Sequence, residues 1–345
     1  MRKKEPDMAE KRKIIMDVDT GSDDAIALCM AMLDPDFELL GICTVGGNVE
    51  AKLTTDNSLR VVECCGMQGK VRVYRGAERP IAATLLPWVP QAQKLPIRDG
   101  TKKEFNQHPF HLPLPEPVIT AERKSAVSFI LDTLLESSDG EITYVSIGPM
   151  TNLALAMRAD ERIIGKLRAV FCMGGGHETG NESAAGEFNV WADPEAAEIV
   201  LQSGADITMV PLDATTTAKF DEEDERRIRE LGTAPAVLVA DLLKQRIDAY
   251  QVIEPSDLKE TAVHDALALC SIIHPEVLTD VRFCTVHTDI SRGFAYGETI
   301  LDQRPRNKEA ANCRFALKAD RQFFNDYIYR VLSEAKDREL QISIF

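Results

Sequence analysis

Several kinds of segment are missing from this sequence, and their absence argues against several classes of protein. No apolar run reaches the roughly 20 residues that cross a bilayer, and the N-terminal stretch MRKKEPDMAEKRK lacks the apolar core of a secretory signal. The eight cysteines include no Cys-x-x-Cys pair, which favours buried free thiols over disulfides or zinc. We therefore expect a cytoplasmic protein without a membrane partner, beginning with a flexible tail over residues 1–12.

Positive charge is scarce in this chain. There are 40 Lys and Arg against 55 Asp and Glu, a net charge of −15, whereas nucleic acids and anionic membranes require a basic face. We therefore expect no nucleic-acid partner, and a small neutral substrate suits the chain better. With 345 residues and 44% hydrophobic content, the chain can bury a substantial core in one large domain or two smaller ones.

Common phosphate and calcium motifs are also absent. The chain has neither the Gly-Lys-Ser/Thr of a Walker A loop nor a Gly-x-Gly-x-x-Gly. Three glycines at 174–176 follow a predicted strand, but no Lys or Arg comes after them. An EF-hand loop fails because Gly21 and Ser22 occupy its fifth and sixth positions. These absences weaken nucleotide-phosphate and EF-hand hypotheses.

Acidic residues are concentrated instead in residues 14–28, IIMDVDTGSDDAIAL. An apolar strand, a glycine turn and an Ala-rich helix follow one another here, and open α/β sheets bind ligands at such junctions. The stretch carries four carboxylates, Asp17, Asp19, Asp23 and Asp24. Because uncompensated buried carboxylates are costly, we expect a cation among them, and oxygen ligands favour Mg²⁺ or Ca²⁺.

Apolar segments alternate between strand and helix patterns along the chain, which predicts an α/β fold with a mainly parallel central sheet. After the opening strand, further strands are predicted at 37–45, 71–74, 141–147, 167–173, 207–212, 281–288 and 313–317. One helix is predicted to follow the opening strand and to end at about residue 33, and two others are predicted to begin at residues 151 and 193. Further helices are predicted at 51–65, 121–136, 221–229, 235–250, 266–273 and 320–335. Residues 78–117 break the pattern with eight prolines, and we expect a lid-like loop there.

A second group of polar residues lies in GNESAAGEFNVWADPEAA, at residues 180–197. Glu187 and Asn189 are two residues apart, so in an extended chain their side chains point to the same side. An acceptor and a donor together suit the recognition of neighbouring hydroxyls. Asn48, which follows the strand at 37–45, is a further candidate ligand-binding residue.

The motifs DVDTGSDDA, TVGGN, IGPMTNLA, CMGGG, EFNVWADPEAA and VHDALAL occur in the chain order of one known family. Over residues 14–288 the chain resembles the inosine-uridine preferring nucleoside hydrolases. The resemblance implies a single domain over residues 13–345 with the nucleoside hydrolase fold and a Rossmann-like core. It also implies a bound Ca²⁺, hydrolysis of the N-glycosidic bond of ribonucleosides to free base and ribose, nucleoside salvage, and a homodimer or homotetramer.

The resemblance assigns roles to individual residues. The implied Ca²⁺ ligands are the carboxylates of Asp19, Asp24 and Asp265 and the backbone carbonyl of Ile147. The implied ribose-binding residues are Asp23, Asn48, Asn181, Glu187, Asn189 and, through its backbone, Met173. We hypothesise that Asp19 and calcium activate the attacking water, and that His264 protonates the leaving base because its ordinary pKa near 6.5 suits transfer around neutrality.

Two departures from the family pattern concern the base. Residues 84–117 contain no His-Gly, which many members carry in the loop after the third strand, and neither His108 nor His111 aligns with that histidine. Thr216-Thr217 stands where many members have Thr-His. The sequence therefore does not predict the base preference.

Two other functions stay open from the sequence. A phosphatase of the haloacid-dehalogenase type would use Asp17 as its nucleophile, although Gly21 occupies the last place of the Asp-x-Asp-x-Thr/Val pattern. A nucleoside- or ribose-binding protein without turnover would keep the same residues, although the presence of Asp19 and His264 gives no sign of lost catalysis.

Overall fold

The computed structural model describes residues 11–82, 85, 97–98, 104–105, 108–253, 258–291 and 293–342. Residues 1–10 of the predicted tail, and parts of the predicted lid at 78–117, lie outside this set. Within it, no helix is both long and apolar enough to cross a membrane. All eight cysteines are free thiols, as expected.

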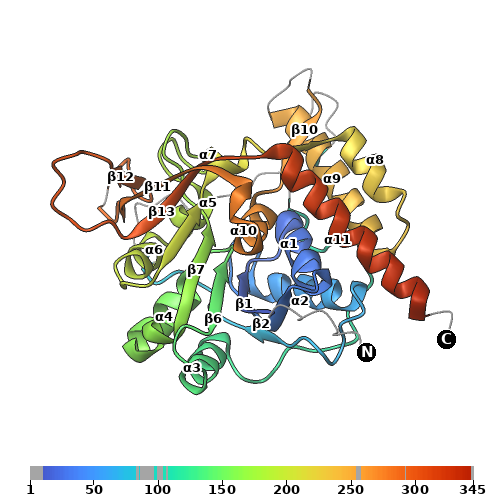
Figure 1. Cartoon of the computed structure of the whole chain (residues 1–345), viewed down its shortest axis with the longest axis horizontal. Helices are drawn as coiled ribbons and strands as arrows, with labels where there is room; N and C mark the ends of the chain where they lie inside the picture. The colour runs from blue at the N-terminus through green and yellow to red at the C-terminus, as the bar shows by residue number, and fades with distance from the viewer. Residues whose placement is uncertain are drawn as a thin grey trace, which may run out of the picture.

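A nine-stranded sheet in the order β12-β11-β13-β8-β7-β6-β1-β2-β3 forms the framework (Figure 1). Its strands are β1 Arg12–Val18, β2 Phe37–Thr44, β3 Val73–Arg75, β6 Ile142–Ser146, β7 Leu167–Met173, β8 Ile207–Val210, β11 Leu278–Thr288, β12 Thr299–Asp302 and β13 Cys313–Ala319. All neighbours from β13 to β3 pair in parallel, and only β11 pairs antiparallel, with β12 and β13. The predicted mainly parallel α/β fold is confirmed.

Two short ribbons hold the remaining strands of the described residues. One pairs β9 Lys219–Asp221 with β10 Glu260–Ala262. The other pairs β4 Ile97–Arg98 with β5 Glu104–Phe105 and lies against the long helix α9. This second ribbon belongs to the predicted lid segment, so part of that segment is positioned beside α9.

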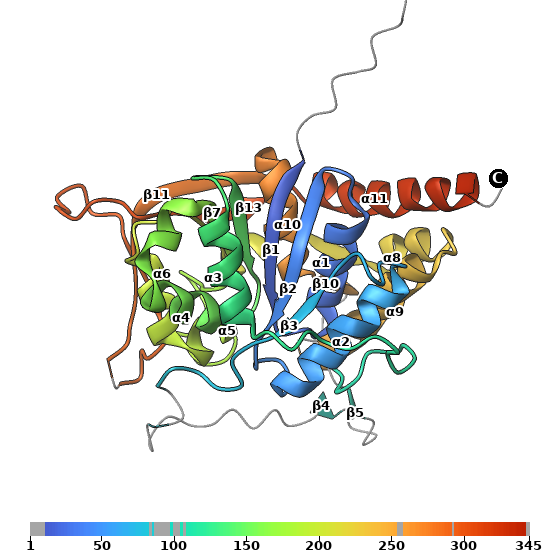
Figure 2. The same cartoon turned by 90° about the horizontal axis from the view of Figure 1, so that it is seen from below.

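Helices cover both faces of the sheet (Figure 2). One face carries α1 Ser22–Leu33, α2 Ala51–Cys64, α8 Glu222–Arg229, α9 Ala234–Ile253, α10 His264–Ile273 and α11 Arg321–Ile342. The other carries α3 Ala126–Glu136, α4 Thr151–Ala159 and α6 Pro194–Leu201. Shorter helical segments are α5 Phe188–Ala192, α7 Leu212–Thr215, η2 Glu161–Lys166 and η3 Pro275–Val277.

The alternation of side chains along β1 divides its residues between two cores. Ile14, Met16 and Val18 pack with α1 and its neighbours, whereas Ile15 packs with α3 and α4 on the opposite face. Successive side chains of a strand point to opposite faces of the sheet. The same alternation directs Asp17 to the face of Ile15.

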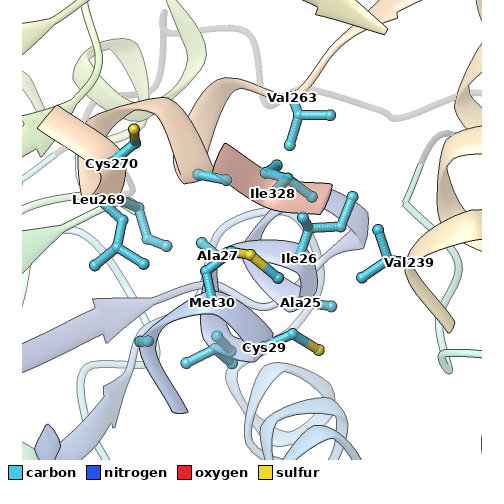
Figure 3. Packing of buried hydrophobic residues seen from close by; sticks show 14 of the residues in the cluster. Ala25, Ile26, Ala27, Cys29, Met30, Val239, Val263, Leu269, Cys270 and Ile328 are labelled. Atoms are coloured by element: carbon cyan, nitrogen blue, oxygen red, sulfur yellow. The ribbon is translucent and has the colours of Figure 1, made fainter. Parts of the chain in front are cut away.

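Helix α1 is buried on nearly all sides, which explains why its sequence after the first turn is apolar rather than amphipathic. Figure 3 shows its side chains packed among residues of α9, α10 and α11, including Val239, Leu269, Cys270 and Ile328. Burying one large side chain such as Ile26 stabilises the fold by about 1.5–3 kcal/mol. This packing fixes the N-terminus of α1, where Asp23 and Asp24 lie.

Candidate active site

Three buried carboxylates meet where two helices begin. Asp23 and Asp24 lie in the first turn of α1, and Asp265 lies in the first turn of α10. One oxygen from each of the three lies within 4.8 Å of the others. Burial and neighbouring carboxylates raise the pKa of Asp24 and of Asp265 well above the usual value. An oxygen-rich acidic cluster of this kind is able to hold a hard divalent cation.

Asp19 joins this cluster from the end of β1. Its backbone N–H donates to Asp24 Oδ1 over 3.0 Å, and its Oδ2 accepts from the backbone N–H of Asn48 over 2.5 Å. Two glycines make room for the carboxylate. A Cβ on Gly47 would lie 2.1 Å from Asp19 Oδ2, and one on Gly148 would lie 2.9 Å from Oδ1. Both glycines are therefore required by the position of the Asp19 side chain.

Asp17 lies on the other side of the sheet and does not take part in the cluster. Its two oxygens accept hydrogen bonds from Tyr144 Oη over 2.7 Å and Asn152 Nδ2 over 2.8 Å, and it is fully buried. The sequence grouped Asp17 with the other three carboxylates of its stretch, which is wrong because Asp17 is a strand residue that points to the face of Ile15, whereas the other three follow the end of β1 at Val18. A fully buried carboxylate held in this way also does not suit the nucleophile of a phosphatase.

Asp23 is contacted by an arginine and a histidine from two distant segments. Arg246 Nη1 of α9 lies 3.1 Å from Asp23 Oδ1, and His108 Nδ1 lies 3.8 Å from the same oxygen. Burial acts to raise the pKa of Asp23, but Arg246 first, and then the imidazoles of His108 and His264, outweigh it and lower the pKa. Asp23 is thus favoured as a carboxylate, in contrast to Asp24.

Glu187 and Asn189 frame the ends of β6 and β7. Glu187 caps α5 and accepts backbone hydrogen bonds from Gly175 over 2.7 Å, Asn189 over 3.0 Å and Val190 over 3.2 Å. Burial raises the pKa of Glu187 to about 7 despite these bonds. The prediction of extended chain here is wrong at Asn189, because Glu187 caps a helix that begins at Phe188.

The Asn189 side chain instead points to two strand ends. Its Nδ2 donates to the carbonyl of Ile147 over 2.9 Å and to the carbonyl of Met173 over 3.1 Å. Asn181 is exposed, and its Oδ1 accepts from the Phe188 N–H over 2.9 Å, which fixes the start of α5. Asn48 donates through Nδ2 to Asp24 Oδ2 over 3.1 Å.

His264 begins α10 beside Asp265 and is buried. Its Nδ1 lies 2.7 Å from Thr215 Oγ1, and its Nε2 lies 3.5 Å from the hydroxyl of Tyr250. Burial lowers the pKa of His264 to about 4, although the charge of Asp23 acts against this shift. The imidazole is therefore neutral at pH 7, and the argument from its ordinary pKa does not hold.

The lid segment contributes a histidine that the sequence did not assign. His108 Nδ1 accepts from the Ser22 N–H over 3.4 Å at the start of α1. A Cβ on Gly21 would lie 2.2 Å from this nitrogen, so glycine at that position admits the ring. His111 instead lies on the surface, with Nδ1 3.1 Å from Asp56 of α2. The two histidines therefore differ in location, and only His108 reaches the cluster.

The structure brings most of the assigned residues to one end of the sheet and adds four. The predicted residues that meet there are Asp19, Asp23, Asp24, Asn48, Ile147, Met173, Glu187, Asn189, His264 and Asp265. The residues without an assigned role in the sequence are His108, Thr215, Arg246 and Tyr250. Thr215 follows the predicted strand at 207–212 and Tyr250 ends the predicted helix at 235–250, which is a weak signal, whereas Arg246, inside that helix, gave none.

Comparisons with known proteins identify relatives of this chain. A model of the inosine-uridine preferring nucleoside hydrolase family matches residues 14–326. The pyrimidine-specific ribonucleoside hydrolase RihB of Escherichia coli O9:H4 (strain HS) is 35% identical over 316 residues, which cover 91% of this chain and 95% of that protein.

Solved structures of nucleoside hydrolases also match this chain. The purine-preferring ribonucleoside hydrolase of Gardnerella vaginalis has a TM-score of 0.83 at 29% identity, over 94% of this chain and 99% of that one. An inosine-uridine preferring nucleoside hydrolase of Bacillus anthracis, with a TM-score of 0.70 and 19% identity over 94% and 99% of the two chains, shares the fold.

Proposed function

Because this chain belongs to the inosine-uridine preferring nucleoside hydrolase family and is thus a ribonucleoside hydrolase, we propose that its reaction depends on Ca²⁺ and on Asp19. The observation that carries the proposal is the meeting of Asp23, Asp24 and Asp265 within 4.8 Å, beside the ends of parallel strands. Hydrolysis of the N-glycosidic bond would release free base and ribose.

The donor set fits a calcium ion. Asp19, Asp24, Asp265 and the Ile147 carbonyl would hold it, and all of these ligands are hard oxygens of the kind that Ca²⁺ prefers. The carboxylates are buried and close together, so a cation would relieve their mutual repulsion. A bound calcium ion would supply positive charge that acidifies water and attracts the sugar hydroxyls.

We assign the chemical roles to residues on the two sides of this cluster. Asp19 would accept the proton of the attacking water as general base. Ribose hydroxyls would be held by Asp23, Asn48, Asn181, Glu187, Asn189 and the Met173 backbone. Negative and polar groups around the sugar stabilise the positive charge that develops on it during glycosidic cleavage.

His264 would face the departing base. Because its imidazole is neutral at pH 7, it would act by hydrogen bonding rather than as an imidazolium acid. Tyr250, whose hydroxyl lies 3.5 Å from His264 Nε2, would supply a second polar group on this side. His108, which approaches Asp23 from the lid segment, would close the site.

We propose pyrimidine ribonucleosides as the preferred substrates. The relative named as pyrimidine-specific is 35% identical to this chain, whereas the solved structure named as purine-preferring is 29% identical. Uridine and cytidine are therefore the first substrates to compare with inosine, adenosine and guanosine.

The test is release of free base and ribose from these five ribonucleosides and their 2′-deoxy analogues. We expect hydrolysis in Ca²⁺, loss after chelation, and recovery when Ca²⁺ is restored. Recovery with Mg²⁺ but not with Ca²⁺ would contradict the choice of metal. Absence of release from every ribonucleoside by the folded, calcium-supplied protein would contradict the function itself.

The resemblance also leads us to propose a homodimer or homotetramer in the cytoplasm, acting in nucleoside salvage. Light scattering coupled to size-exclusion chromatography gives the subunit number, since one chain has a mass of 38.2 kDa. A mass of one chain at micromolar concentration would contradict the oligomer.

A further inference from the structure

Arg246 connects three elements from a fully buried position. Its side chain is 0% exposed and extends from α9 toward the start of α1. Nη1 donates to Ser22 Oγ over 2.8 Å and lies 3.1 Å from Asp23 Oδ1. Nε and Nη2 both donate to the carbonyl of Ala262, over 3.1 and 2.9 Å. Ala262 ends β10, two residues before His264, so one guanidinium links α9, α1 and the approach to α10.

The permanent positive charge of Arg246 gives Asp23 a different kind of partner from those of the other carboxylates in the cluster. Asp23, Asp24 and Asp265 all lie close enough to share one cation. Arg246 forms its ion pair with Asp23, whereas Asp24 accepts backbone N–H bonds from Asp19 and Gly21. Asp23 therefore already has a fixed cationic partner, and a metal ion gains less by recruiting it than by recruiting Asp24 or Asp265.

We propose that Arg246 is a positioning residue that reserves Asp23 for the sugar. By fixing Oδ1 of Asp23, it orients this carboxylate to accept a ribose hydroxyl and keeps it out of the metal coordination. The inference rests on the proposed function, because it divides the cluster between a metal and a ribose. It adds a residue from α9, remote in sequence from every motif, to the recognition of the sugar.

A buried arginine also has a purely architectural explanation, and the two explanations differ in what they predict. Breaking a buried ion pair destabilises a protein by leaving one charge uncompensated, so loss of stability alone does not separate them. If Arg246 acts only as support for α10, its removal displaces Asp265 and weakens metal binding. If it positions Asp23, its removal affects one hydroxyl of the sugar and leaves the metal site intact.

The experiment compares Arg246→Lys, Arg246→Gln, Asp23→Asn and the double variant Asp23→Asn/Arg246→Gln with the unchanged protein. Lys244→Gln, an exposed position on the same helix that pairs with Asp248, serves as the matched control. Calorimetric titration of metal-free protein with Ca²⁺ gives the metal affinity without turnover. Steady-state kinetics with one ribonucleoside and its 2′-, 3′- and 5′-deoxy analogues give the contribution of each hydroxyl.

The hydroxyl bound by Asp23 is identified as the one whose removal lowers kcat/KM of the unchanged protein but not of Asp23→Asn. Discrimination at a hydroxyl is the ratio of kcat/KM for the ribonucleoside to kcat/KM for the analogue that lacks this hydroxyl. At the hydroxyl bound by Asp23, we expect this ratio to be at least tenfold smaller in Arg246→Gln than in the unchanged protein. The Ca²⁺ affinity of the variant should be equal or tighter, because a nearby positive charge is gone. The double variant should lose no more than Asp23→Asn alone, since coupled residues are non-additive. Lys244→Gln should match the unchanged protein.

Three results would overturn the proposal: unchanged hydroxyl discrimination in Arg246→Gln, equal losses for all analogues, or at least tenfold weaker Ca²⁺ binding. If Arg246→Gln does not fold, Arg246→Lys decides, because it keeps the charge but not the forked geometry. Arg246→Lys should lose part of the discrimination at the same hydroxyl, whereas discrimination equal to that of the unchanged protein would overturn the proposal. Inactivity of the unchanged protein on every ribonucleoside would instead contradict the proposed function.

Discussion

The side-chain amide of Asn189 donates a hydrogen bond to the backbone carbonyl of Ile147 over 2.9 Å. A second bond from the same nitrogen reaches the Met173 carbonyl over 3.1 Å, so one side chain of α5 joins the ends of β6 and β7. The Ile147 carbonyl is also a proposed metal ligand. Asn189 thus orients a backbone oxygen that would otherwise depend on loop geometry alone.

Asn189→Asp tests this link because it preserves shape while replacing the donor with an acceptor. The one oxygen that replaces Nδ2 would then face the carbonyl oxygens of Ile147 and Met173, and buried polar groups left unsatisfied cost about 1–3 kcal/mol each. We expect the free energy of unfolding in urea to fall by about 2–4 kcal/mol and kcat/KM to fall with it. Gln68→Glu makes the same amide-to-carboxylate change at an exposed position with no assigned role, and an equal loss there would contradict the expectation.

Removing one carboxylate of the cluster should change stability in opposite directions with and without metal. Burial and the charges of Asp23, Asp24 and Asp19 raise the pKa of Asp265, so Asp265→Asn relieves repulsion in the metal-free protein and should raise its Tm. A ligand at 100 times its Kd stabilises the native state by about 2.7 kcal/mol. Addition of Ca²⁺ should therefore not stabilise the Asp265→Asn variant by this amount. Asp139→Asn, a largely exposed control, should keep this stabilisation, and a retained calcium response in Asp265→Asn would contradict its role as ligand.

The position of Asp19 should be sensitive to a single methyl group. A Cβ on Gly47 would lie 2.1 Å from Asp19 Oδ2, so Gly47→Ala must displace the proposed general base. We expect Asp19→Ala to abolish turnover and Gly47→Ala to lower kcat by at least about 100-fold, as general base catalysis contributes roughly 10²–10⁴-fold. Gly165→Ala, where a Cβ meets nothing within 4 Å, is the matched control. Full activity of Gly47→Ala would show that the site tolerates displacement of Asp19.

Loss of His264 should affect substrates according to their base. Because the group would assist departure of the base by hydrogen bonding, His264→Ala should reduce kcat most for the bases that leave poorly. Turnover of a nucleoside with a good leaving group, such as a nitrophenyl riboside, should change little. Measuring kcat across such a series gives the dependence directly. Equal losses on every substrate would contradict the assignment.

The sequence predicted the fold from local patterns, and it predicted most of the residues that meet in the candidate site from those patterns together with the family resemblance. Alternating strands and helices define a parallel sheet, and the carboxyl ends of its strands lie together, so Asp19 and Asn48 were expected to meet. Asp17 was misplaced because it still belongs to β1, which ends at Val18, whereas Asp19 lies beyond the strand, where the alternation no longer applies. His108 and Arg246 reach the site from an irregular segment and from the middle of a helix. Only the tertiary packing brings them there, and no pattern of residue spacing in the sequence predicts it.

Asp193 should make stability depend on pH in a predictable direction. It caps α6 by accepting from the Ala196 N–H over 3.2 Å, and it accepts from Thr151 Oγ1 over 2.6 Å and from the Ile81 N–H over 2.9 Å, yet burial raises its pKa from 3.8 to about 6. The folded state therefore holds the proton more tightly than the unfolded state. Its stabilising contribution is complete below about pH 4 and is lost as the pH rises through about 6.

Asp193→Asn keeps an N-cap side chain at this position but does not titrate. The free energy of unfolding of the unchanged protein, minus that of the variant, should fall between pH 4 and 6 by at most about 1.4 kcal/mol per pH unit. Above pH 7 the difference should be constant, because the carboxyl is then ionised in both states. Urea denaturation of metal-free protein at half-unit pH intervals measures this difference. A flat difference from pH 4 to 8 would mean that Asp193 titrates at the same pH in the folded and unfolded chains, and its three hydrogen bonds would then offset the whole cost of its burial.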